Sequence, residues 1–256
     1  MKLASWNVNS LKVRLEQVLQ WLDVHRPDVL GLQETKLIDE KFPTDPFAEL
    51  GYHPVFAGQP TYNGVALIAS SEPTETVTEI PGFADEQRRV IAGTVNGVRV
   101  INLYVVNGKA VGTDKYAYKL DWFAAVTAWV EDELRRHDRL VVMGDFNIAP
   151  DDRDVHDPEA WREKILCSTP ERSALRKMMD LGLVDTFRLF DQEEGIFSWW
   201  DYRAAAFRRG LGLRIDLVLA SKALADSCTK AWVDAEPRRN ERPSDHAPAV
   251  AEFDLD

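Results

Sequence analysis

The chain has 256 residues and a formal net charge of −11, which suits one large α/β domain and argues against a protein that coats nucleic acid non-specifically. No apolar run approaches the roughly 20 residues that span a bilayer, and the amino terminus lacks a signal peptide, so we expect a cytoplasmic protein without a membrane partner. The two cysteines, Cys167 and Cys228, lack the spacing of a zinc site, and reduced thiols are expected.

The predicted elements alternate between strands and helices without a flexible linker, so residues 1–256 are expected to form a single domain. Residues 3–8 are predicted to form a strand, followed by a helix that Ser10 caps and Pro27 ends. The apolar residues of this helix share one face: Leu11, Leu15, Val18, Leu19 and Leu22. Residues 28–33 and 64–69 are predicted to form the next strands.

The middle of the chain carries a hairpin signal, because the turn Asn96-Gly97 joins two runs of β-branched residues, 90–95 and 98–106. Helices are predicted at 118–137 and at 173–181, the second ended by Gly182. Further strands are predicted at 140–143, 215–220, 230–233 and 249–253. Hairpins together with helices indicate mixed or antiparallel sheets covered by helices.

Polar side chains follow the first two of these strands. Glu34 comes directly after residues 28–33 and is either a surface acid paired with Lys36 or a Mg²⁺ ligand. Asn7 lies at the end of the first strand, where its amide either forms a turn or orients a carboxylate or a phosphate oxygen. In company with the acids described next, the metal-binding interpretation of Glu34 is favoured.

Asp145 and Asn147 follow the apolar strand 140–143 and are two residues apart. In extended backbone both side chains would point the same way, and an acid beside an amide can position and deprotonate a water molecule. The alternative is an Asx turn that ends the strand.

A histidine with a chemical role is predicted near the carboxyl terminus. His246 follows Asp245 within Pro243–Pro248, and Asp216 lies inside an apolar strand where it requires a partner. That partner is either Arg214, on the same face of the strand, or His246, which an acid would orient and hold charged. Tyr104 is either a core aromatic or a phenol that donates to phosphate.

Aromatic residues alternate with arginines between residues 197 and 214, a composition typical of stacking on bases and pairing with phosphates. The residues predicted to bind DNA are Trp199, Tyr202, Arg203 and Arg214. The alternative is a half-buried loop with a solvated basic edge.

Five segments in this order resemble the exonuclease III family of the endonuclease/exonuclease/phosphatase superfamily: residues 6–10, 32–36, 144–147, 197–203 with 213–216, and 244–248. The resemblance covers essentially the whole chain. It implies a four-layer α/β sandwich in which two packed mixed β-sheets are flanked by helices. It also implies a Mg²⁺-dependent DNA repair phosphodiesterase that hydrolyses the P–O3′ bond, as an AP endonuclease and/or a 3′→5′ exonuclease with 3′-phosphatase activity.

The resemblance assigns roles to individual residues. Asp145 would activate water, Asn147 would orient the water or the phosphate, and Tyr104 would contact the phosphate or Asp145. His246, held by Asp216, would bind the phosphate oxygen that gains charge.

The same resemblance implies a metal and a partner. Glu34 would be the main ligand of Mg²⁺, with Mn²⁺ as an alternative, Asn7 beside it and Asp245 nearby. Trp199 would line the pocket for the sugar at the scissile site. We expect a monomer that acts on double-stranded DNA with abasic sites or 3′ ends.

Residues 163–172 are expected on the DNA face, where Leu166 introduces no obvious clash; this favours abasic-site cleavage together with exonuclease activity. Two other functions stay open. One is a phosphodiesterase of the same superfamily that acts on non-DNA phosphoesters such as lipid or inositol head groups. The other is a non-catalytic DNA-binding module, against which stands the set of acids, amides and histidine.

Overall fold

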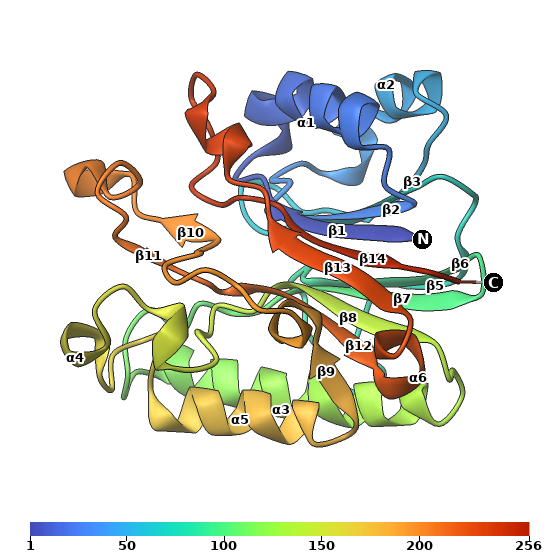
Figure 1. Ribbon diagram of the computed structural model, residues 1–256. Helices are drawn as coiled ribbons and strands as arrows, with labels where there is room; N and C mark the ends of the chain where they lie inside the picture. Colours follow the sequence, from blue (N-terminus) through green and yellow to red (C-terminus); the bar gives the residue numbers. More distant parts are fainter. Residues whose placement is uncertain (256) are drawn as a thin grey trace.

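The computed structural model describes residues 1–255 and contains two six-stranded sheets packed face to face, with helices outside (Figure 1). The first sheet has the order β13 (Cys228–Val233), β14 (Ala249–Phe253), β1 (Lys2–Asn7), β2 (Val29–Gln33), β4 (Val65–Ala69) and β3 (His53–Ala57). The second has the order β5 (Thr74–Val77), β6 (Val90–Val95), β7 (Val98–Tyr104), β8 (Leu140–Asp145), β12 (Asp216–Ser221) and β9 (Leu183–Asp185). A short ribbon pairs β10 (Trp199–Trp200) with β11 (Gly212–Leu213).

The helices cover the outer faces of the two sheets. Figure 1 shows α1 (Leu11–His25) and α2 (Thr44–Glu49) on the first sheet, and α3 (Asp114–Leu134) and α5 (Thr169–Met179) on the second. The remaining α-helices are α4 (Pro158–Trp161) and α6 (Lys222–Ala225). Within residues 1–255, none of these helices has the length and apolar character to cross a bilayer.

Three apolar layers hold the sandwich together. In β8, Leu140 and Val142 pack toward the helices of the second sheet, whereas Val141 and Met143 pack between the two sheets. Successive side chains of a strand point to opposite faces, so a strand covered on both sides is apolar throughout. The third layer joins α1 to the first sheet through residues such as Trp6 and Leu22. The expected α/β sandwich with two mixed sheets is therefore confirmed.

Most of the predicted elements are present, with shifted ends. The hairpin at Asn96-Gly97 is confirmed, since β6 and β7 are antiparallel with Val95 opposite Val98. Helix α3 begins at Asp114 rather than at residue 118, because the Thr113 hydroxyl accepts from the Tyr116 amide. Helix α5 begins at Thr169 rather than at residue 173, because Ser168 and Glu171 form a capping box. Strand β5 was not predicted, since its exposed sequence carries no apolar run.

The strand ends that carry polar residues meet at one end of the sandwich. In the first sheet β1 and β2 are parallel, so Asn7 and the residue after Gln33 leave the sheet together. In the second sheet β7 and β8 are parallel, with Tyr104 opposite Asp145, and antiparallel pairing of β8 with β12 sets Asp216 opposite Asp145 as well. Strand register thus gathers side chains from five strands at one place.

One buried amide joins the two sheets below that place. Asn102 of β7 donates to the carbonyl oxygens of Leu32 (2.9 Å) and Ala66 (3.0 Å), and its own oxygen accepts from Gln33 Nε2 (2.6 Å). A Cβ at Gly31 would lie 2.9 Å from the Asn102 side chain, so glycine permits this close approach. These contacts set how the two sheets sit relative to each other directly beneath the polar residues.

Candidate active site

Asp145, Asp216 and His246 form the buried centre of the site. The Asp216 Oδ2 lies 2.9 Å from His246 Nδ1, and the Asp145 Oδ2 lies 3.8 Å from His246 Nε2. The Ser198 hydroxyl also donates to Asp216 Oδ2 at 2.6 Å. The predicted pairing of Asp216 with His246 is therefore confirmed, and the alternative pairing with Arg214 is wrong.

The segment that carries His246 is tied to β1. Ser244 Oγ donates to the Asn7 carbonyl at 2.6 Å, and the Trp6 indole donates to the His246 carbonyl at 3.2 Å. Ser244 therefore has a structural role. These bonds connect residues more than two hundred positions apart and fix the imidazole over the end of the first sheet.

The imidazole of His246 is held as a cation. Burial alone would lower the pKa of His246, but the charges of Asp216 and Asp145 outweigh burial and raise this pKa to about 10. Burial also raises the pKa of Asp145, and the charge of His246 opposes that rise. Asp216 accepts the proton on Nδ1 and so directs the Nε2–H toward Asp145.

Asn147 is bound directly to Asp145. Its backbone N–H donates to Asp145 Oδ1 at 2.9 Å, and its side-chain Nδ2 donates to Asp145 Oδ2 at 3.2 Å and to the Val105 carbonyl at 3.0 Å. The backbone is not extended as expected, because Asn147 has a φ of 48°. The predicted convergence of the two side chains is confirmed, but it is reached through an Asx turn, the alternative that was considered.

Glu34 and Asp145 are joined by one amide. Asn7 Nδ2 donates to Glu34 Oε1 at 3.0 Å and to Asp145 Oδ2 at 2.9 Å, and the Tyr104 hydroxyl donates to Glu34 Oε1 at 2.8 Å. Tyr104 is therefore part of the site and not only a core aromatic. The Asn7 oxygen accepts from the Asn9 N–H at 2.9 Å, so this amide orients two carboxylates and a ligand role for its oxygen stays a prediction.

The charges around Glu34 favour an ionised carboxylate and a protonated phenol. Burial would raise the pKa of Glu34, but Lys36, Asn7 and Tyr104 together bring this pKa below its usual value. Lys36 Nζ lies 2.9 Å from Glu34 Oε2. Glu34 therefore pairs with Lys36 and is also part of the site. Burial and the charge of Glu34 raise the pKa of Tyr104 well above its usual value, so its hydroxyl remains a donor.

The donor set fits a divalent cation. Ligand atoms of Asp145, Asp216 and His246 lie within 4.8 Å of one another, which makes them a candidate metal site. Glu34 adds a third carboxylate to those of Asp145 and Asp216, and Asn7 links it to Asp145. Carboxylate and amide oxygens are the ligands that hard cations prefer.

Asp245 lies at the rim of the site and extends its polar network. Its Oδ1 accepts from Asn9 Nδ2 at 2.9 Å, and its Oδ2 accepts from the Trp199 indole at 3.1 Å. The Asn9 oxygen accepts from Lys36 Nζ at 2.5 Å, so Asp245 is connected to Glu34 through Asn9 and Lys36. The structure thus brings Asp245 and Trp199 to the same end of the sandwich as the buried centre.

The aromatic and arginine residues between 197 and 214 do not share one surface. Arg203 is exposed, and Tyr202 is 51% exposed, with its hydroxyl donating to the Pro243 carbonyl at 2.8 Å. Arg214 is 1% exposed; its Nε lies 2.6 Å from Asp154 and its Nη2 lies 2.7 Å from Asp185. The prediction that Arg214 contacts DNA is wrong, because its guanidinium is used inside the protein by two acids.

Residues 163–172 contain contacts that were not predicted. Leu166 is buried among Ala149, Cys167 and Leu213, with a φ of 73°. Glu171 is fully buried and pairs with Lys119. The Ser168-x-x-Glu171 capping box is readable from sequence, but nothing local to Lys119 signals its partner.

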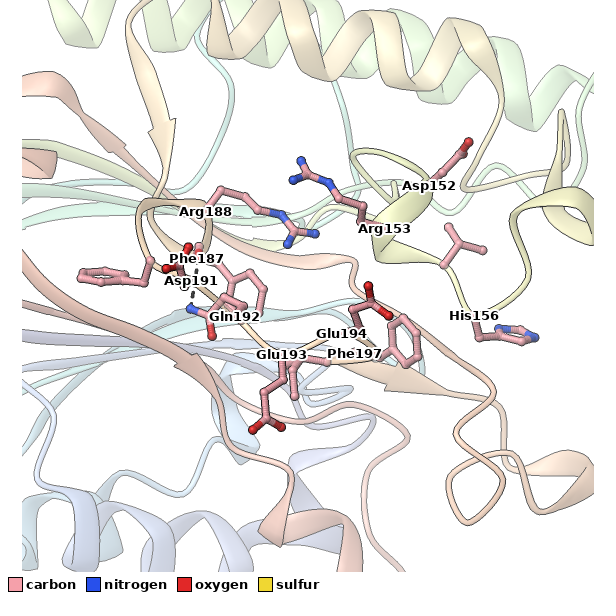
Figure 2. Close-up of a pocket in the computed structure, with 14 residues that line it drawn as sticks. Asp152, Arg153, His156, Phe187, Arg188, Asp191, Gln192, Glu193, Glu194 and Phe197 are labelled. Atoms are coloured by element: carbon pink, nitrogen blue, oxygen red, sulfur yellow. Dashed lines mark hydrogen bonds between the residues drawn. The ribbon is translucent and has the colours of Figure 1, made fainter.

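A cavity of about 700 Å³ lies apart from this site and is lined by residues of 152–156 and 187–197 (Figure 2). Figure 2 shows Arg153 and Arg188 on one side of it and Glu193 and Glu194 on the other. The lining residues do not include the carboxylates and the imidazole described above. Its mixed charge selects neither an anion nor a cation, so it adds nothing to the site.

Comparison with known proteins agrees with the geometry. Residues 4–246 match the Endonuclease/Exonuclease/phosphatase family. Exodeoxyribonuclease III of Haemophilus influenzae is 36% identical, and the alignment covers 99% of this chain and 100% of that protein. Two structures of NExo from Neisseria are 52% identical to this chain, with a TM-score of 0.98 and coverage of 100% of both chains. One is described as a 3′-5′ exonuclease, and the other as a 3′ phosphatase bound to a product DNA hairpin. An AP endonuclease from Archaeoglobus fulgidus is 38% identical with a TM-score of 0.96, again over 100% of both chains.

Proposed function

We propose a reaction for this chain on the basis of its family. The chain belongs to the exonuclease III family of the endonuclease/exonuclease/phosphatase superfamily. It is a DNA repair nuclease of the exodeoxyribonuclease III and AP endonuclease type. The reaction is hydrolysis of the P–O3′ bond in double-stranded DNA, at a 3′ end or at an abasic site, with Mg²⁺ bound. The observation that carries the proposal is the Asn7 amide that joins the Glu34 and Asp145 carboxylates beside the His246 imidazolium.

The residues of the chain supply positioning, a base and a fixed positive charge. Asp145, whose pKa burial raises, accepts the proton of the attacking water, and Asn147 holds its carboxylate in place. His246 carries its charge within 3.8 Å of Asp145, where it binds the phosphate oxygen on which negative charge develops. The Tyr104 hydroxyl donates a hydrogen bond to Glu34 Oε1 and so lies on the Glu34 side of the site.

Mg²⁺, or Mn²⁺ as an alternative, would be held by Glu34 with Asn7 and Asp245 nearby, and when bound it polarises the phosphate and stabilises the leaving oxygen. The Glu34 side is favoured because both ring nitrogens of His246 already face acids, Nδ1 toward Asp216 at 2.9 Å and Nε2 toward Asp145 at 3.8 Å. Isothermal titration with Mg²⁺ separates this placement from one centred on Asp216. Glu34→Gln should weaken Mg²⁺ binding strongly, whereas Asp216→Asn should change it little.

The partner is proposed to be double-stranded DNA bound by a monomer. NExo, the 52% identical relative, is described bound to a product DNA hairpin. In this chain Trp199 donates to Asp245 and Tyr202 donates to the Pro243 carbonyl, so both aromatic side chains lie beside the segment that carries His246. Trp199 donates to Asp245 and so stands at the rim where a sugar would enter. A cytoplasmic location stays a prediction.

A comparison of defined substrates tests the proposal. The duplexes carry an abasic site, a recessed 3′-hydroxyl or a 3′-phosphate, and inositol phosphates represent the non-DNA alternative, all with Mg²⁺. We expect turnover of at least one duplex, loss of that turnover with a chelator, and no turnover of inositol phosphates. Activity on inositol phosphates alone, or near-normal turnover by a folded His246→Ala variant, contradicts the proposal.

A further inference from the structure

The buried pair of Lys119 and Glu171 stands directly behind the candidate active site. Lys119 of α3 and Glu171 of α5 both have side chains with 0% exposure, and the ammonium contacts a Glu171 carboxylate oxygen. Lys119 Nζ also donates to the Asn147 carbonyl at 2.7 Å and to the Asn107 carbonyl at 3.2 Å. These three acceptors use all three N–H groups of the ammonium, so its position is fully determined.

The bond to the Asn147 carbonyl acts on the conformation of a catalytic residue. Asn147 has a φ of 48°, in the left-handed region that Asn tolerates better than most residues. Its N–H is bound to Asp145 Oδ1 and its carbonyl is bound to Lys119, so hydrogen bonds hold the peptide groups on both sides of its Cα. Loss of the second bond frees the carbonyl to rotate and, with it, the side-chain amide that contacts Asp145 Oδ2.

Glu171 anchors the pair to a second loop. Its Oε1 also accepts from the Leu166 N–H at 3.1 Å, and its Oε2 accepts from the Ser168 N–H at 3.1 Å and from the Ser168 hydroxyl at 2.6 Å. The ammonium is therefore backed by a carboxylate that is itself held by three donors. Buried charges with so many partners resist displacement, which is the property needed to hold a loop still.

We propose that Lys119, backed by Glu171, is a positioning residue that orients Asn147 and through it Asp145 for the reaction. The inference rests on the proposed function. It predicts that the pair acts on turnover, whereas a pair that only stabilises the fold leaves the turnover of folded protein unchanged. A misplacement of catalytic groups by about 1 Å can cost about 100-fold in rate.

The experiment uses Lys119→Met and the double variant Lys119→Met/Glu171→Gln. The double variant contains no unpaired buried charge, so it recovers thermal stability relative to the single variant, but it still lacks the donor to the Asn147 carbonyl. Both variants should lower kcat on the best duplex substrate by about 10- to 100-fold, with KM within about threefold of wild type. Kinetics are measured at a temperature where circular dichroism shows folded protein.

A matched control comes from another buried pair. Arg99 and Glu133 have side chains with 2% exposure and an Nε–Oε2 distance of 2.5 Å, and Arg99 lies opposite Leu140, at the far end of β7 from Tyr104. Arg99→Met should lower the melting temperature and leave kcat within about twofold of wild type.

The outcomes separate the inference from the proposed function. Wild-type kcat in either folded Lys119 variant, or recovery of kcat together with stability in the double variant, overturns the positioning role while the nuclease assignment stands. A kcat loss in Arg99→Met equal to that in Lys119→Met also overturns it, because the effect would then follow stability. An inactive wild-type enzyme on every duplex removes the proposed function and, with it, this role of Lys119.

Discussion

The strand-end cluster around Asp145 and the segment of residues 197–214 were both expected to act on DNA, yet their side chains are placed in different ways. In the cluster, the pairing of β8 with β7 and β12 sets both Tyr104 and Asp216 opposite Asp145. In residues 197–214, Arg203 is exposed, whereas Arg214 is buried against Asp154 and Asp185. Strand register determines where a side chain points. Outside paired strands, packing decides, so one arginine is exposed and the other is buried.

The largest effect expected from this comparison concerns the cluster. Asp145→Asn removes the carboxylate proposed to accept the proton from water, while the amide still fits the buried position. We expect kcat to fall about 10³-fold or more, with DNA affinity retained. Gel-shift binding and single-turnover cleavage on the same duplex check this, with Asp121→Asn, an exposed acid of α3, as the control. Near-wild-type turnover would show that the cluster is not the catalytic centre.

The next effect sharpens the contrast within residues 197–214. Arg214→Met leaves two buried carboxylates without their shared cation, which should lower the free energy of unfolding by about 3–5 kcal/mol. Arg203→Ala should leave that free energy unchanged and weaken DNA binding by a few-fold, more at low salt than at high salt. Urea denaturation and binding at two salt concentrations measure both. Unchanged stability in Arg214→Met, together with weaker DNA binding, would return Arg214 to the DNA interface.

The smallest effect concerns the charge of His246. Asp216 contributes most to raising the pKa of His246, so Asp216→Asn should lower that pKa toward the value that burial alone favours. The imidazole then loses its proton at a lower pH, and the alkaline decline of kcat should begin at a lower pH than in wild type. Ring resonances followed by NMR, beside the pH–rate profile, test this. An alkaline limb that does not move contradicts the role of Asp216.

Much of the fold followed from local patterns. The Asn96-Gly97 turn and the apolar runs of β2, β4 and β8 predicted their strands to within a few residues. The exposed strand β5 and the first turns of α3 and α5 were missed, because their residues carry no apolar periodicity. Of the site, Glu34, Asn7, Asp145, Asn147, Asp216 and His246 were all predicted, and all are brought together.

The amino-acid sequence by itself determined which polar residues leave the ends of buried strands, because a two-residue period and a turn signal are local properties. Only the tertiary structure decided that Arg214 turns inward and that Lys119 reaches the carbonyl of Asn147. Their acidic partners lie far along the chain: Asp154 is 60 positions from Arg214, and Glu171 is 52 positions from Lys119. A charge is buried only where a distant partner offsets its desolvation, and the residues around it do not reveal that partner.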